Sequence, residues 1–251
     1  MSFAKNLYIV AAKRTPFGTF GGKLTNFTAT DLAVESSKAA LAAGKVNPDI
    51  IDTVVFGNVA QSSIDAPYLA RHVGLRAGAP EESIAQTVNR LCGSGFQSIV
   101  SGCQEILTGE ASVALVGGTE SMTQTPLSVY GQNARFGVKL GNGIQLTDTL
   151  WAALTDTYTK LPMALTAEKL AEQNDISRED CDEYALRSQT TWKEANDKGV
   201  FKDEIAAMEI KGRKGAEVFD TDEHPKPQST AEALAKLKPV FKKDGVVTAG
   251  N

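Results

Sequence analysis

The first 120 residues alternate between short apolar runs and segments of helical periodicity, and this alternation restricts the fold more than any other feature of the sequence. Apolar runs typical of strands occupy residues 6–12, 52–59, 84–89 and 113–116, and helical patterns occupy residues 29–43, 67–76 and 93–107. Strands that alternate with helices in this way form a mostly parallel sheet covered by helices on both faces. The predicted fold class is therefore α/β.

The pattern changes in the second half of the chain. Residues 121–145 lack clean periodicity and are rich in glycine, serine, threonine and asparagine, and helical segments follow at residues 164–174 and 178–198. We therefore expect a compact α/β domain over residues 1–120, followed by an inserted helical and loop domain over residues 121–251.

Charge and hydropathy exclude several classes of partner. The 251 residues carry a formal net charge of -4, whereas a protein that binds nucleic acid needs a basic face for the phosphates. No apolar run approaches the roughly 18 residues that a membrane span requires. We expect a globular protein that binds neither nucleic acid nor membrane.

The cysteines do not form a metal-binding pattern. Cys92, Cys103 and Cys181 lie at distant and irregular spacings, and only His72 and His224 could add nitrogen ligands. No zinc or iron–sulfur site is therefore expected. Three unpaired cysteines fit a reducing compartment, in which a cysteine either fills the core or acts as a nucleophile.

Cys92 has a sequence environment that suits a nucleophile. It lies between the strand predicted at residues 84–89 and the helix predicted at residues 93–107, in a turn that contains Gly93 and Gly95. Free N–H groups at a helix start favour a thiolate, but their contribution of about 0.3–1 kcal/mol still leaves a nearby base necessary. The glycines leave room for a substrate carbonyl to approach the backbone.

The spacing alone leaves a second interpretation of Cys92 open, because cysteine also packs as a small hydrophobe at strand–helix junctions. Cys103 falls on the apolar side of the same predicted helix, and Cys181 lies near the start of the helix predicted at residues 178–198. We interpret Cys103 and Cys181 as structural.

Four motifs resemble those of the thiolase family. Residues 89–95, Asn-Arg-Leu-Cys-Gly-Ser-Gly, are similar to the segment around the family's acyl-accepting cysteine, and residues 10–18 resemble its first strand and turn. Residues 117–122, Gly-Gly-Thr-Glu-Ser-Met, and residues 248–251, Thr-Ala-Gly-Asn, are similar to two further motifs. The resemblance extends from about residue 7 to the last residue and is strongest to the 3-ketoacyl-CoA thiolases of mitochondria.

This resemblance implies an acyltransferase. In the implied reaction Cys92 attacks a 3-ketoacyl-CoA, acetyl-CoA leaves, and coenzyme A then removes the acyl group from the cysteine. The reverse reaction condenses two acyl-CoA molecules. Coenzyme A is a co-substrate, and no cofactor is bound permanently. The family fold has two similar α/β halves with a loop domain inserted in the first, which matches the predicted division at residue 120.

Other motifs of the family do not occur in the 251 residues. These are an Asn-Glu-Ala segment, a Gly-His-Pro histidine and a second cysteine, and neither His72 nor His224 matches the family's histidine. The resemblance therefore implies that the chain ends before the last strand of the first half and before the second half, and that it is inactive alone. The alternative function is a non-catalytic module that binds CoA or pairs with thiolase subunits.

The resemblance places four coenzyme A contacts in the second half of the chain. Lys226 aligns with an arginine that contacts phosphate or adenine, and Ser229 aligns with a polar contact in the same loop. Phe241 and Ala249 match positions that line the pantetheine path. Lysine keeps the positive charge at position 226 but lacks the planar guanidinium of arginine.

The resemblance also implies an oligomer. Thiolases pair through the strand that precedes the nucleophile, so we expect a homodimer or a tetramer that uses residues 84–89. Residues 1–30 contain basic but no acidic side chains, a bias typical of mitochondrial targeting segments and also compatible with a strand and loop of the fold. The expected location is the mitochondrial matrix.

Overall fold

A computed structural model describes residues 6–212 and 215–251, so the first residues of the basic N-terminal segment lie outside the description. The chain forms two compact units. The first comprises Met1–Pro126 and Asp203–Glu223, and the second comprises Leu127–Lys202 and His224–Asn251. The first unit thus includes a hairpin from beyond residue 120, and the functional division at residue 120 stays a prediction.

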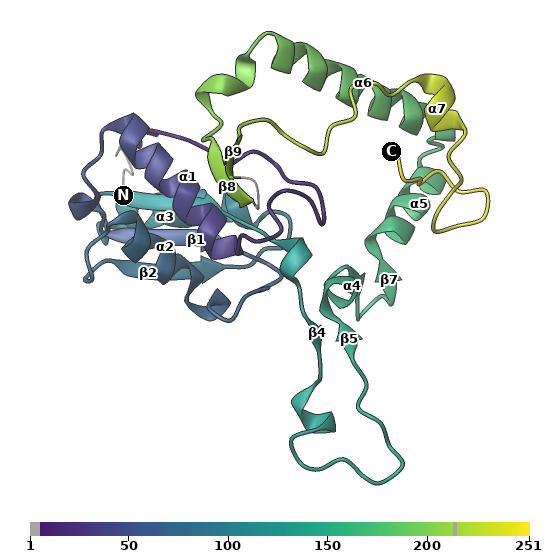
Figure 1. The fold of residues 1–251 in the computed structure, drawn as a ribbon, viewed down its shortest axis with the longest axis horizontal. Helices are drawn as coiled ribbons and strands as arrows, with labels where there is room; N and C mark the ends of the chain where they lie inside the picture. The colour runs from purple at the N-terminus through teal and green to yellow at the C-terminus, as the bar shows by residue number, and fades with distance from the viewer. Residues whose placement is uncertain (1–5, 213–214) are drawn as a thin grey trace. The chain divides into compact units, whose positions relative to one another are not determined.

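The first unit contains a three-stranded parallel sheet with helices on both faces (Figure 1). Its elements are α1 (Ala29–Gly44), β1 (Thr53–Gly57), α2 (Leu69–Ala77), β2 (Ile84–Val88), α3 (Ser94–Thr108), β3 (Ala114–Gly118), and the antiparallel pair β8 (Met208–Gly212) and β9 (Gly215–Phe219). The strand order is β2-β1-β3, with β1 parallel to both neighbours. The predicted α/β class is therefore confirmed.

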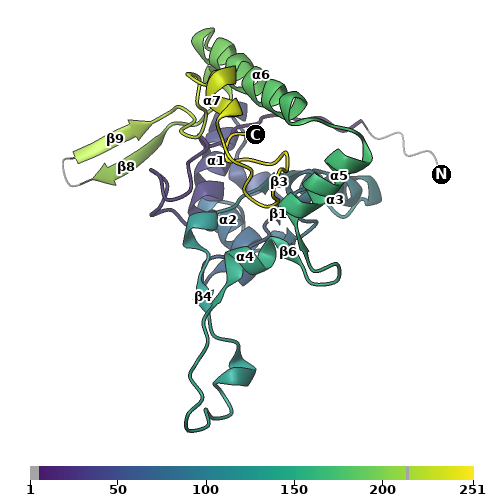
Figure 2. The ribbon, with the colours of Figure 1, turned by 90° about the vertical axis from the view of Figure 1, so that its right-hand side faces the viewer.

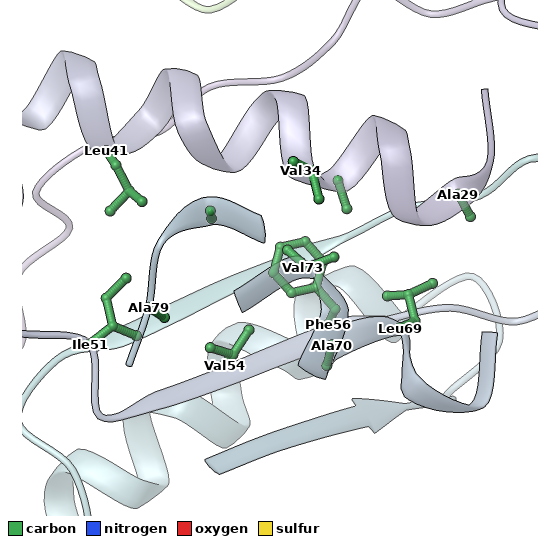
Figure 3. Packing of buried hydrophobic residues seen from close by; sticks show 12 residues of the cluster. Ala29, Val34, Leu41, Ile51, Val54, Phe56, Leu69, Ala70, Val73 and Ala79 are labelled. Atoms are coloured by element: carbon green, nitrogen blue, oxygen red, sulfur yellow. The ribbon is translucent and has the colours of Figure 1, made fainter. Parts of the chain in front are cut away.

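The core of the first unit lies between β1 and the helices α1 and α2 (Figure 3). Val54 and Phe56 of β1 face this side, where Val34 of α1 and Val73 of α2 pack, and each of the four is at most 2% exposed. Because side chains alternate along a strand, Gly57 faces the opposite side, where α3 lies. The central strand is therefore buried on both faces.

The strand predicted at residues 6–12 does not form. Tyr8, Ile9 and Val10 are 79%, 83% and 70% exposed, and no strand of the described residues pairs with them. A strand needs a neighbour to satisfy its backbone hydrogen-bonding groups, and an apolar run cannot specify that neighbour. The prediction was wrong for this segment because an apolar run indicates that residues are hydrophobic but does not indicate which strand they pair with.

Helix α3 contacts the sheet through small residues rather than through its apolar side chains. Its buried residues are Ser94, Ser98 and Gly102, whereas Phe96 is 73% exposed and Ile99 is 40% exposed. Small side chains bring the helix backbone close to the strands. The fully buried positions of α3 are therefore small residues, whereas two of its apolar residues are exposed.

A part-buried ion pair joins the N-terminal segment to the residues that follow the hairpin of β8 and β9, whose strands lie side by side in Figure 2. The guanidinium of Arg14 donates to both carboxylate oxygens of Asp222, at 2.7 and 3.1 Å. Asp222 also accepts the backbone N–H of Phe17 at 2.8 Å, and its side chain is only 5% exposed. These hydrogen bonds between Asp222 and the N-terminal segment explain why the hairpin belongs to the first unit.

The second unit is largely helical. Its elements are β4 (Leu127–Ser128), β5 (Thr147–Asp148), α4 (Thr149–Ala153), β6 (Thr155–Asp156), β7 (Leu161–Pro162), α5 (Met163–Gln173), α6 (Arg178–Asp197) and α7 (Ala231–Ala235). A capping box formed by Ser177 and Asp180 starts α6. None of the helices in the described part of the chain is long and apolar enough to cross a bilayer.

The last residues of the chain are fixed to α5 by one buried carboxylate. Glu168 is 3% exposed, and its two oxygens accept the backbone N–H groups of Val246 and Val247, each at 2.9 Å. Because a buried carboxylate without partners is costly, this arrangement fixes the path of the segment that contains Phe241 and Ala249.

The hydrogen bonds of the Asp52 carboxylate should make the stability of the fold depend on pH. Its carboxylate accepts the N–H groups of Ser112 and Val113, at 2.7 and 3.0 Å, and these bonds hold its pKa below the ordinary value. The ordinary pKa of an aspartate is about 4. Above that pH the lowered pKa of Asp52 stabilises the fold, and this contribution is lost as the pH falls through the folded-state pKa.

We therefore expect Asp52→Asn to lower the urea midpoint at pH 7, and the difference from the unchanged protein to shrink as the pH falls toward 3. Urea unfolding at a series of pH values measures this. A difference that stays constant over that range would contradict the assignment.

Candidate active site

Cys92 lies in a tight turn between β2 and α3, as the sequence predicted. Strand β2 ends at Val88, and α3 begins at Ser94, two residues after the cysteine. The Cys92 side chain is exposed. Leu91 has a φ of 49°, a left-handed conformation that is uncommon for a residue with a β-carbon. The Asn89 side chain supports it by accepting the Leu91 N–H at 3.0 Å.

The Ser94 hydroxyl joins the two sides of this turn. Its oxygen accepts the backbone N–H of Arg90 at 2.8 Å and donates to the carbonyl of Leu91 at 2.6 Å. The N–H of Gly93 also donates to the Arg90 carbonyl at 3.1 Å. A residue in a sparsely populated conformation costs about 1–3 kcal/mol, so these bonds are needed to hold Leu91 in place.

The turn rests on the ends of two strands. A β-carbon added to Gly57, the last residue of β1, would lie 2.5 Å from the carbonyl carbon of Ser94. One added to Gly118, at the end of β3, would lie 2.9 Å from the Cα atom of Gly95. Only glycine allows backbone to approach backbone so closely. The start of α3 is therefore placed by direct contact with the sheet.

Free amide groups lie in the first turn of the helix that follows the cysteine. The N–H groups of Gly95 and Phe96, in the first turn of α3, have no acceptor among the described residues. Such a helix start favours an anion, either a thiolate or the oxygen that develops on an attacked carbonyl. The arrangement suits nucleophilic attack by the sulfur of Cys92, provided that a base takes its proton.

The two histidines have different environments in the described structure. His72 lies in α2, with its Nδ1 atom 3.4 Å from Oδ2 of Asp65 and its ring stacked on Tyr68. His224 is exposed and belongs to the second unit. No hydrogen bond found among the described residues joins a histidine to Cys92.

The other two cysteines have different surroundings. Cys103 is half-buried in α3, and Cys181 is half-buried in α6. Burial raises the pKa of the Cys181 thiol, and the carboxylates of Asp182 and Asp180 raise it further. A raised thiol pKa disfavours the reactive thiolate, so this environment does not suit a nucleophile.

Two of the predicted coenzyme A contacts share one turn of the second unit. The Ser229 N–H and hydroxyl both donate to the carbonyl of Lys226, at 3.0 and 2.7 Å. Gln189 of α6 accepts the N–H of Lys226 at 2.7 Å. The three hydrogen bonds hold the Lys226 backbone, and its exposed side chain carries a cation at this turn.

The other two predicted contacts lie on neighbouring segments of the same unit. The N–H of Val240 donates to the carbonyl of Val247 at 3.0 Å, which brings the segments of Phe241 and Ala249 together. The Phe241 ring stacks on Trp151, with centroids 6.4 Å apart and 5° between the planes. Sequence reasoning missed Trp151, because a single tryptophan in α4 belongs to no motif. The four predicted contacts thus occupy the second unit, whereas the cysteine turn occupies the first.

The fold and the turn together define an α/β protein whose candidate nucleophile lies where a parallel strand passes into a helix. Residues 7–251 match the family model for the N-terminal domain of thiolase. Human mitochondrial 3-ketoacyl-CoA thiolase (Homo sapiens) is 61% identical over 251 residues, which are 100% of this chain and 63% of that protein. The chain therefore belongs to the thiolase family.

Solved structures agree with this assignment. The crystal structure of human mitochondrial 3-ketoacyl-CoA thiolase matches with a TM-score of 0.94 at 62% identity, over 97% of this chain and 61% of that chain. The same human enzyme in complex with CoA matches with a TM-score of 0.93 at 61% identity, over 97% of this chain and 60% of that chain. The chain thus spans less than two thirds of the length of these relatives.

Ser94→Ala tests how the cysteine turn is held. The substitution leaves the part-buried Arg90 N–H without its acceptor, so we expect the free energy of unfolding to fall by about 1–3 kcal/mol. The Arg90 amide should also exchange its hydrogen faster. Ser98→Ala is the control, because among the described residues the Ser98 hydroxyl bonds only to the Gly95 carbonyl in the same helix. Equal Arg90 exchange rates in the two variants would show that the hydroxyl does not hold the turn.

Proposed function

We propose that the protein is an acyltransferase of the thiolase type, in which Cys92 carries the acyl group. The observation that supports this most strongly is the exposed Cys92 on its hydrogen-bonded turn before α3, within a chain that matches the thiolase N-terminal domain over residues 7–251. The relatives named as 3-ketoacyl-CoA thiolase suggest the substrate.

The proposed reaction has two steps. The thiolate of Cys92 attacks the C3 carbonyl of a 3-ketoacyl-CoA, the bond between C2 and C3 breaks, and its electron pair stays on C2. C2 takes a proton and leaves as acetyl-CoA. The thiol of coenzyme A then loses its proton and attacks the acyl-cysteine, which releases acyl-CoA and restores Cys92. The reverse sequence condenses two acyl-CoA molecules.

The loop domain over residues 121–251 is proposed to bind coenzyme A. Lys226 supplies a cation for a phosphate or for the edge of adenine, and Ser229 supplies a polar contact. Phe241 and Ala249 line the path of the pantetheine arm. The exposed Lys226 side chain and the stacking of Phe241 on Trp151 support these roles, as does the crystallisation of a similar human enzyme with CoA.

Pairing of subunits is proposed to use β2, in a homodimer or a tetramer. β2 is an edge strand of the three-stranded sheet, and Ile84 is 57% exposed. An edge strand with free backbone groups is able to pair with a second copy. The mitochondrial matrix is the proposed location, because the named relatives are mitochondrial and residues 1–30 lack acidic side chains.

A second candidate function is a non-catalytic module that binds CoA or pairs with thiolase subunits. The environment of His72 favours it for this chain taken alone, since its ring bonds to Asp65 and no hydrogen bond among the described residues joins a histidine to Cys92.

An acyl-enzyme trap distinguishes the two functions. The product of the complete coding sequence, mixed with acetoacetyl-CoA and no free CoA, should gain one acetyl group on the peptide that contains Cys92. Mass spectrometry of the peptides measures this. Cys92→Ser should gain none, and the control Cys103→Ser should be acetylated like the unchanged protein.

Acetylation elsewhere, or none at all, would reject the acyltransferase. The 251-residue chain alone is expected to give no turnover of acetoacetyl-CoA. Turnover by that chain alone would reject the requirement for further residues.

A further inference from the structure

Glu120 joins the loops that follow β1 and β3, beside the cysteine turn. Its Oε1 atom accepts the side-chain amide of Asn58 at 2.9 Å, and its Oε2 atom accepts the N–H of Val59 at 3.0 Å. The N–H of Ala60 lies 3.3 Å from both oxygens. One carboxylate thus receives three donors from three consecutive residues.

Asn58 connects the ends of all three parallel strands. It follows β1 directly and is 1% exposed. Its backbone N–H donates to the carbonyl of Val88, the last residue of β2, at 3.2 Å. Its Nδ2 atom donates to the carbonyl of Thr119, the residue after β3, at 3.0 Å. The loop of Asn58 is thereby fixed against the strand that leads into the cysteine turn.

The orientation of the Asn58 amide is determined by its nitrogen. Both Nδ2 protons have acceptors, the Thr119 carbonyl and the Glu120 carboxylate, whereas Oδ1 is buried with no donor among the described residues. Rotating the amide would place its oxygen against two acceptors. An aspartate at this position would do the same and add a second negative charge, so the geometry requires asparagine.

The loop of Asn58 is connected to the cysteine turn through backbone contacts. Gly57, the residue before Asn58, abuts the backbone of Ser94, and its carbonyl accepts the N–H of Thr119 at 3.0 Å. A shift of the loop at Asn58 would therefore displace the first turn of α3. That displacement would change the distance between the sulfur of Cys92 and the free N–H groups that follow it.

We propose that Asn58 and Glu120 are positioning residues for Cys92, which hold the start of α3 so that its free amides face the sulfur. Neither residue touches the sulfur or the substrate in this proposal. The inference rests on the proposed function, because it gives the position of Cys92 a chemical purpose.

Alkylation of Cys92 by iodoacetamide tests the proposal on the full chain, with peptide mass spectrometry to follow each cysteine and Cys103 as the internal reference. We expect Asn58→Ala to slow alkylation of Cys92 about fivefold near neutral pH, the factor that corresponds to about 1 kcal/mol of thiolate stabilisation.

Ser83→Ala is the matched control. The Ser83 hydroxyl is also neutral and buried, and it donates to the carbonyl of Ile51 at 2.6 Å, before the other end of β1. It should lower stability without changing the alkylation of Cys92. Asn58→Ser is the milder variant if Asn58→Ala does not fold, and circular dichroism with urea unfolding establishes folding for each variant.

Glu120→Gln separates positioning from charge. Removing a nearby negative charge would by itself favour the thiolate and speed the reaction, whereas loosening the loops should slow it. We therefore expect slower alkylation in Glu120→Gln. Faster alkylation in this variant, or rates within twofold of the unchanged protein for both sites, would overturn the proposal, as would equal slowing in Ser83→Ala.

The outcome is distinguishable from failure of the proposed function. If the unchanged protein forms no acyl group on Cys92 while Asn58→Ala still slows alkylation, the acyltransferase is rejected and the positioning role stands. If the acyl group forms and the variants react like the unchanged chain, only the positioning role is rejected.

Discussion

The first turn of α3 lies in backbone contact with the carboxyl ends of β1 and β3, and the position of Cys92 depends on this contact. Glycine at positions 57 and 118 makes the close approach possible, because a β-carbon at either would meet backbone atoms within 3 Å. The turn itself is then held by side chains from both sides, Asn89 before the cysteine and Ser94 after it. Sheet packing and turn chemistry thus fix the same cysteine.

Away from the cysteine, three single carboxylates each accept hydrogen bonds from several backbone N–H groups. Asp52 does this before β1 and β3, and Glu120 does so after those strands. Glu168 does so in the second unit, where it fixes the segment before Ala249. Because a carboxylate accepts several hydrogen bonds at once, one side chain can define the path of a loop that has no regular structure.

The sequence was sufficient for the elements whose signals are local. Hydrophobic periodicity located β1, β2, β3 and α3, and the glycines around Cys92 predicted its place between a strand and a helix. It was insufficient where pairing or burial depends on distant residues. The apolar segment at residues 6–12 is exposed, and α3 meets the sheet through Ser98 and Gly102 instead of its larger side chains.

The site could be predicted only in part for the same reason. Cys92 stands in a recognisable local motif, whereas Asn58 and Glu120 are 62 residues apart and act through a contact that no spacing reveals. The predicted coenzyme A contacts were named by resemblance, and the structure adds the hydrogen bonds of the Lys226 backbone and the ring that stacks on Phe241. A local motif such as that of Cys92 can be recognised in the sequence, but the long-range contacts that hold it in place cannot.

The urea-unfolding free energy of Gly57→Ala tests the central contact most directly. A β-carbon at position 57 would lie 2.5 Å from backbone, so we expect the free energy of unfolding to fall by about 1–3 kcal/mol. Gly143→Ala is the control. A β-carbon at position 143 would meet no atom within 4 Å, so this free energy should change by less than ~0.5 kcal/mol. Replacing a strand glycine by alanine without a clash stabilises by about 0.5–1 kcal/mol. A Gly57→Ala protein as stable as the unchanged one, or more stable, would contradict the close contact that places Cys92.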